Sequence, residues 1–108
     1  MIIITTQCFF PQIGGIESLM TGMAEAMRSA GKDVLVLADG KKNAGDESKK
    51  YKIKRFSGWK PYRRIHKANY LKKIIANNNI EAIYADSWKS IEYLNLVKVK
   101  IIVLAHGT

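Results

Sequence analysis

Residues 9–17 read Phe-Phe-Pro-Gln-Ile-Gly-Gly-Ile-Glu, and the fold is decided by what stands on either side of them. An apolar run at residues 1–6 precedes this stretch, and an amphipathic run at residues 16–30 follows it. That order predicts a strand, a glycine-bearing loop and a helix. In α/β domains this arrangement presents the N-terminus of the helix to a bound ligand. Gly14 and Gly15 leave no Cβ between the backbone amides and whatever approaches them. The same pair is also compatible with a plain tight turn.

The run at residues 16–30 follows helical spacing. At about 100° per residue its apolar side chains fall on one side and its polar side chains on the other. The apolar set is Ile16, Leu19, Met20, Met23, Ala26, Met27 and Ala30. Gly31 stands where a helix C-cap belongs. We therefore expect a helix that buries a methionine-rich face in the core.

Five segments have the composition of β-strands, and two further segments have the pattern of helices. The predicted strands span residues 1–6, 33–38, 51–56, 81–85 and 99–105. The third alternates apolar and basic residues, as an edge strand with one solvated face does. The further helices are predicted at 62–77, with an apolar stripe of Ile65, Ala68, Leu71 and Ile75, and at 87–96. Right-handed crossovers then give an α/β fold, a Rossmann-like three-layer sandwich with a mostly parallel five-stranded sheet in the order 3-2-1-4-5.

Length and composition set the class of protein. The 108 residues make one domain at most. No apolar run approaches the roughly 20 residues of a membrane-spanning helix, and residues 1–6 do not resemble a signal peptide. The single Cys8 can close no internal disulfide, which fits a reducing cytoplasm. Because the chain stops at Thr108, directly after its last predicted strand, we expect it to be the truncated N-terminal part of a larger protein.

The net charge of +9 is concentrated in one part of the sequence. Between Lys41 and Lys73 there are 13 basic residues against Asp46 and Glu47, and the rest of the chain is slightly acidic. Such a region suits an anionic membrane leaflet, a lipid phosphate or a nucleic acid, although it is equally compatible with a merely solvated surface. The aromatic residues match no RNA-binding motif, so we expect no specific nucleic acid partner.

Candidate site residues follow from the rule that ligands of parallel α/β sheets bind at the carboxyl ends of the strands. His106 follows the last predicted strand directly, and we expect it to be functional. Asp86 either caps the following helix together with Ser87 or contacts a ligand. Asp39, after the second strand, could hold a ribose, but the glycine pattern is not that of a dinucleotide site.

Residues 10–17 (FPQIGGIE), with a helix that closes at residues 30–34 (AGKDV), resemble the N-terminal signature of retaining GT-B glycosyltransferases of the large sucrose-synthase/mannosyltransferase type, which are glycosyltransferase family 4-like. Gln12 replaces the second proline of that signature, and Lys32 replaces its usual histidine. Residues 103–108 (VLAHGT) are similar to a later strand of the family that ends in a His-Gly pair. Residues 83–88 lie where the family often carries an H-x-H segment, from which Tyr84 and Asp86 depart.

This resemblance implies a transferase that moves a sugar from a nucleotide-sugar to a glycan or lipid-linked acceptor with retention of configuration. It implies that Gly14 and Gly15 bind the donor phosphates and that His106 is catalytic. Asp86, Ser87 and Trp88 would lie on the acceptor side, although Trp88 is also suited to packing. The nucleotide-sugar is a co-substrate, and no metal or other cofactor is expected.

The family's nucleotide-binding domain, with its E-x7-E motif, would be the partner domain that the chain lacks. The isolated chain is then expected to be inactive. The resemblance further suggests cell-envelope polysaccharide synthesis in the cytoplasm, with peripheral docking on the inner membrane face through residues 41–73. Two other classes stay open: a non-catalytic phosphate- or nucleotide-binding α/β module, and a basic module that binds membrane or nucleic acid.

Overall fold

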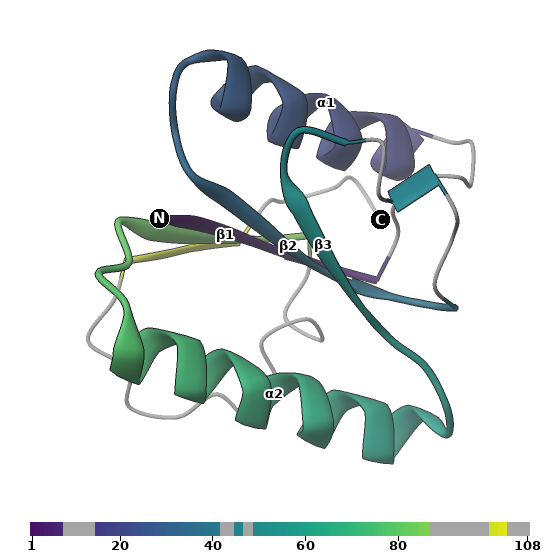
Figure 1. Cartoon of the computed structure of the whole chain (residues 1–108). Coiled ribbons are helices and arrows are strands. Elements are labelled where there is room, and N and C mark those ends of the chain that lie inside the picture. Colours follow the sequence, from purple (N-terminus) through teal and green to yellow (C-terminus); the bar gives the residue numbers. More distant parts are fainter. Residues whose placement is uncertain (8–14, 42–44, 47–48, 87–99, 104–108) are drawn as a thin grey trace.

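The computed structural model describes residues 1–7, 15–41, 45–46, 49–86 and 100–103. Two helices cover opposite faces of one five-stranded sheet (Figure 1). The elements are β1 (Ile2–Thr6), α1 (Gly15–Ser29), β2 (Val34–Asp39), β3 (Lys52–Phe56), α2 (Lys60–Asn77), β4 (Ala82–Ala85) and β5 (Ile101–Val103). The strand order is β3-β2-β1-β4-β5 and every neighbouring pair is parallel. The predicted Rossmann-like α/β fold and its strand order are therefore confirmed.

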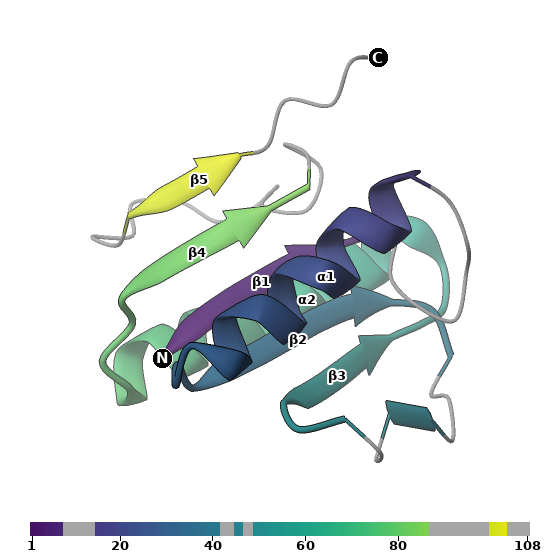
Figure 2. The same ribbon diagram turned by 90° about the horizontal axis from the view of Figure 1, so that it is seen from above.

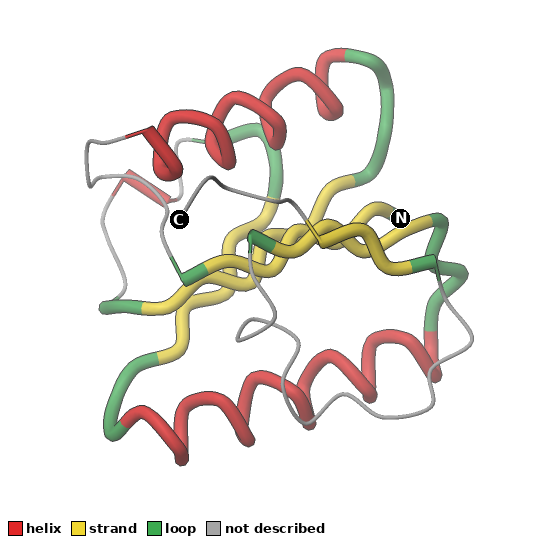
Figure 3. Tube along the Cα trace, turned by 180° about the vertical axis from the view of Figure 1, so that it is seen from behind, coloured by secondary structure: helices red, strands yellow, loops and turns green. Residues whose placement is uncertain are grey.

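The core lies on both faces of β1, the middle strand. All five residues of β1 are buried, and Ile3 and Ile4 are fully so. Successive side chains of a strand point to opposite faces. Ile4 accordingly packs under α1, together with Val36 of β2, while Ile3 packs with Leu71 of α2. Viewed from behind, the sheet lies between the two helices as the central layer of three (Figure 3).

Helix α1 buries a narrower face than the sequence predicts. Met20 and Ala24 are fully buried, and Met23 and Met27 pack against the same cluster while partly exposed. Leu19, which was assigned to the buried face, is 46% exposed. A single helix packed on one face of a sheet covers only the side chains nearest the sheet, so the edges of the predicted stripe remain in solvent.

The predicted C-cap of α1 is confirmed. Gly31 has φ 86°, in the left-handed region that favours glycine. Its amide donates to the Arg28 carbonyl at 3.0 Å, and the Lys32 amide donates to the Met27 carbonyl at 3.1 Å. This nested pair of hydrogen bonds is a Schellman motif, which satisfies carbonyls left free at the helix end.

Helix α2 begins at Lys60, two residues earlier than predicted. Ala68 and Leu71 are buried as predicted, whereas Ile65 is 45% exposed. Lys67, which is 4% exposed, lies on the inner face of the helix where Ile65 was expected. Lys67 stands four residues before Leu71 and so lies on the same side of the helix. A hydrophobicity pattern overlooks such a position because it scores a lysine as polar.

Strand β3 lies at one edge of the sheet, as predicted. Lys52 and Lys54 are exposed, as the alternation predicted. Arg55 instead forms a two-pronged ion pair with Asp46, at 3.1 and 2.9 Å, and the two side chains are only 7% and 5% exposed. This pair fastens the segment before β3 to the strand.

The described part of the last predicted strand is less buried than expected. This part is Ile101–Val103, which is half-buried because β5 forms the other edge of the sheet. The helix predicted at residues 87–96 lies outside the described residues.

Met20→Asp should prevent stable folding, because it places an unpaired charge in the fully buried contact between α1 and the sheet. Leu19→Asp, the same charge on the neighbouring and half-exposed position, should change the free energy of unfolding by no more than about 1 kcal/mol. Urea unfolding followed by circular dichroism compares the two. Equal stability of both variants would show that the buried face of α1 is assigned wrongly.

Candidate functional site

Parallel pairing places the carboxyl ends of all five strands at one edge of the sheet, where the arrowheads in Figure 2 point. The N-termini of α1 and α2 lie at the same edge (Figure 1). Ligands of open α/β sheets bind at this edge. In the described part of the chain it carries the polar groups that follow β1, β2 and β4.

Asp86, which follows β4, links its own strand to the end of β1. Its carboxylate oxygen Oδ2 accepts hydrogen bonds from the Thr6 hydroxyl at 2.8 Å and from the Gln7 amide at 2.9 Å. The Asp86 side chain is buried at 4% exposure. Since Gln7 is the first residue after β1, this contact fixes where the glycine-bearing segment leaves the sheet.

Asp39, at the end of β2, is held by two cations from α2. The Lys67 ammonium donates to its Oδ1 at 2.9 Å, and Arg63 Nε lies 3.2 Å from its Oδ2. Lys67 also donates to the Thr6 carbonyl at 2.9 Å. These contacts occupy both carboxylate oxygens, so they argue against Asp39 as the ribose partner of a dinucleotide.

The ammonium group of Lys67 is buried away from water. Burial lowers the pKa of Lys67 below its ordinary value, and the neighbouring carboxylate of Asp39 opposes that effect. A charge removed from water must be paired and hydrogen-bonded to persist. The Asp39 carboxylate and the Thr6 carbonyl supply these partners, which makes Lys67 the tie between α2 and the ends of β1 and β2.

Gly15 is the first residue of α1, and the structure gives it no conformational need to be glycine. Its φ is not among the positive values, which belong to Gly31, Gly40 and Gly58 within the described segments. Among the described residues, a Cβ built on Gly15 would meet no atom within 4 Å. The first-turn amides of a helix have no partners within the helix. The open space at Gly15 therefore leaves room for a ligand at these amides.

Several predicted site residues cannot be placed. Gly14, Ser87, Trp88 and His106 lie outside the described residues, so their roles stay predictions. Sequence reasoning in turn missed Thr6, Arg63 and Lys67. Lys67 could have been found, because it falls on the inner stripe of α2 that the apolar neighbours Ala68 and Leu71 define.

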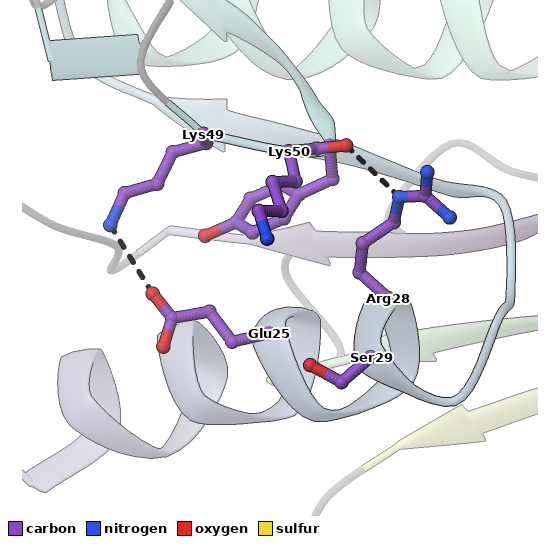
Figure 4. A pocket seen from close by; sticks show the side chains of 6 residues that line it. Glu25, Arg28, Ser29, Lys49 and Lys50 are labelled. Atoms are coloured by element: carbon purple, nitrogen blue, oxygen red, sulfur yellow. Dashed lines mark hydrogen bonds and ion pairs between the residues drawn. The ribbon is translucent and has the colours of Figure 1, made fainter.

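The basic side chains of residues 41–73 are divided in space among several places. Arg55 and Lys67 are buried in ion pairs. Lys49 and Lys50 face α1 on one side of the sheet (Figure 4). Besides Lys67, helix α2 carries five basic and no acidic residues on the other side. Positive charge is thus divided between the two faces.

Three large apolar side chains are exposed at the start of α2. They are Trp59 at 77%, Tyr62 at 61% and Ile65 at 45%. They lie beside the exposed Lys60 in the basic helix. No helix in the described ranges is both long enough and apolar enough to cross a membrane. Within those ranges no group of three or more His, Cys, Asp or Glu residues could hold a metal ion.

Lys67→Met should lower the free energy of unfolding by about 3 kcal/mol, since it removes one partner of a buried ion pair. Lys73→Met, on the exposed side of the same helix, should change it by less than about 0.5 kcal/mol. Adding Asp39→Asn to Lys67→Met should cost less than the two single changes together. Denaturant unfolding of the four variants measures this coupling, and additive effects would contradict a direct pair.

Comparison with known proteins indicates the protein family to which the chain belongs. A search of curated proteins finds no matching relative. The sequence model described as Glycosyltransferase Family 4 matches residues 13–108, a span that includes α1, α2 and the strands from β2 to β5. The match begins within the glycine-bearing segment and covers nearly the whole chain, so the protein belongs to glycosyltransferase family 4.

Proposed function

We propose that this chain is the acceptor-side half of a glycosyltransferase that moves a sugar from a nucleotide-sugar to a glycan or lipid-linked acceptor with retention of configuration. Its family membership supports a glycosyltransferase-type module. The observation that carries the finer proposal is the start of α1 at Gly15, at the strand edge where ligands bind, with open space where a side chain would stand.

The geometry of this edge suits a diphosphate leaving group. The N-terminal amides of α1 and the positive end of its dipole stabilise negative charge. Asp86 fixes the Gln7 amide and with it the start of the connection between β1 and α1. In the proposal the backbone amides of Gly14 and Gly15 bind the donor phosphates, and neither a metal nor another cofactor is needed.

His106 has its proposed role because the described part of β5, which reaches Val103, runs toward the same edge of the sheet as β1. In the proposal His106 hydrogen-bonds the transferred sugar and orients it for reaction. Asp86, Ser87 and Trp88, which follow β4, would lie beside the acceptor. For Asp86 the role is indirect, since its carboxylate already holds Thr6 and Gln7.

A second domain is part of the proposal. The described residues offer the phosphates a helix end, whereas Asp39, the candidate for a ribose contact, is held by Lys67 and Arg63. The base and ribose of the donor would therefore be bound by a nucleotide-binding domain that closes on this one. By itself the 108-residue chain should show negligible transfer.

We also propose a cytoplasmic protein that docks on the inner, anionic face of a membrane, in cell-envelope polysaccharide synthesis. The exposed Trp59 and Tyr62 begin a helix with six basic and no acidic residues. Aromatic side chains favour the headgroup level of a bilayer, and basic side chains are attracted by anionic lipids. A lipid-linked acceptor would be presented at such a surface. No specific nucleic acid partner is proposed.

Transfer should appear when the chain is joined to a nucleotide-binding domain of the proposed type. In that protein His106→Ala should lower kcat roughly 100-fold with little change in nucleotide-sugar affinity. Gly15→Ala should lower kcat at least about tenfold without loss of thermal stability, because its Cβ would intrude only on bound phosphates. Gly22→Ala is the control, since Gly22 lies in the same helix with the same open space. Transfer by the 108 residues alone, or wild-type rates in both site variants, would refute the assignment.

Membrane docking should depend on the aromatic start of α2. Vesicles of phosphatidylglycerol and phosphatidylcholine should co-sediment the protein in proportion to their anionic content and less at high salt. Trp59→Ser combined with Tyr62→Ser should weaken binding at least about threefold, whereas Leu19→Ser, a half-exposed apolar side chain on α1, should not. Equal binding to neutral vesicles would overturn this part of the proposal.

A further inference from the structure

A pocket of about 360 Å³ lies between the last turns of α1 and residues 49–51 (Figure 4). Its lining residues are Glu25, Arg28, Ser29, Lys49, Lys50 and Tyr51. Residues 49–51 lead into the first residue of β3, and α1 runs opposite to the strands (Figure 2). The pocket is therefore at the amino ends of the strands, the edge opposite to the candidate site.

Two contacts hold the walls of this pocket together. The Lys49 ammonium lies 3.2 Å from Glu25 Oε1, and Arg28 Nε donates to the Lys50 carbonyl at 3.0 Å. Both contacts join α1 to the segment before β3. Tyr51 is 5% exposed and belongs to the α1-side core, so it forms a fixed part of the lining.

The charge in the pocket is unbalanced. Three cations face a single carboxylate, and that carboxylate is already paired with Lys49. The Lys50 ammonium has no ion pair or hydrogen bond to any residue in the described ranges. In the view of Figure 4 this ammonium lies between the side chains of Glu25 and Arg28. One cationic donor is thus left for a ligand.

A second cavity continues the first along β3. It has about 420 Å³ and shares Lys49 and Tyr51 with the pocket. It adds Lys52 and Lys54 to the lining, and its one acidic residue, Asp46, is held by Arg55. The positive potential therefore extends beyond the pocket.

We propose that the pocket between α1 and residues 49–51 is a second binding site, which takes a small ligand with a phosphate or diphosphate group. Its volume lies in the range of small-molecule sites. Arg28 and Lys50 offer the guanidinium and ammonium donors that bind phosphate, and Ser29 adds a hydroxyl. The site does not depend on the proposed transfer reaction, since it shares no residue with the edge where α1 begins.

Inorganic pyrophosphate is the probe, and ¹H–¹⁵N NMR titration of the purified protein is the measurement. Saturable shift changes should centre on residues 25–29 and 49–51. Lys50→Gln, which breaks no contact within the described part of the chain, should weaken the affinity at least fivefold. Glu25→Gln should tighten it about threefold, because the carboxylate that repels the anion is lost.

Two variants with the same changes of charge serve as controls. Lys73→Gln removes an exposed charge on the opposite face, and Glu81→Gln removes the exposed partner of Lys32. Both should leave the affinity within twofold of wild type. A loss with Lys73→Gln equal to that with Lys50→Gln would overturn the proposal, as would shift changes confined to the first turn of α1 or an absence of saturation.

Competition distinguishes the two sources of such a ligand. Glucose 1-phosphate represents a soluble sugar phosphate, and dihexanoyl phosphatidic acid represents a lipid headgroup. Displacement of pyrophosphate by either one supports the site and identifies the source. Displacement by neither would contradict a site for phosphate-bearing ligands.

Discussion

The ammonium of Lys67 is the point on which the ligand-binding edge of this domain depends. It lies at the junction of α2, β1 and β2, where it donates to the Asp39 carboxylate and to the Thr6 carbonyl. Removing a charge from water costs several kcal/mol, which these partners offset only in one arrangement of the three elements. The pair therefore contributes less to net stability than to the fixed placement of α2 against the strand ends.

Asp86 likewise fixes the end of β1, from the side of β4. Its buried carboxylate joins the end of β4 to Thr6 and to the Gln7 amide, so β1 is held from both neighbouring strands. The polar groups at the strand ends are thus largely engaged with one another. What the edge offers a ligand in the described residues is the open start of α1 at Gly15.

Family membership separates the alternatives that the sequence left open. A purely basic interaction module is not favoured, because the match spans the fold from the glycine-bearing segment onward. The basic residues nevertheless fall into two groups with different surroundings. Those of α2 adjoin the exposed aromatic residues Trp59 and Tyr62, which suits a bilayer surface, whereas Arg28 and Lys50 line a pocket that is open on one side, which suits a small anion.

The sequence by itself determined the order of elements, the parallel sheet and the C-cap at Gly31, because these follow from local periodicity and backbone preference. It also placed Asp39 and Asp86 at strand ends. Only the tertiary structure decided what those carboxylates do, since their partners are distant in sequence: Lys67 is 28 residues from Asp39, and Thr6 is 80 residues from Asp86. No pattern along the chain encodes such a pairing. The burial of Lys67 was also decided by the tertiary structure. From sequence a lysine is expected to be exposed to water, whereas in the fold Lys67 is removed from it.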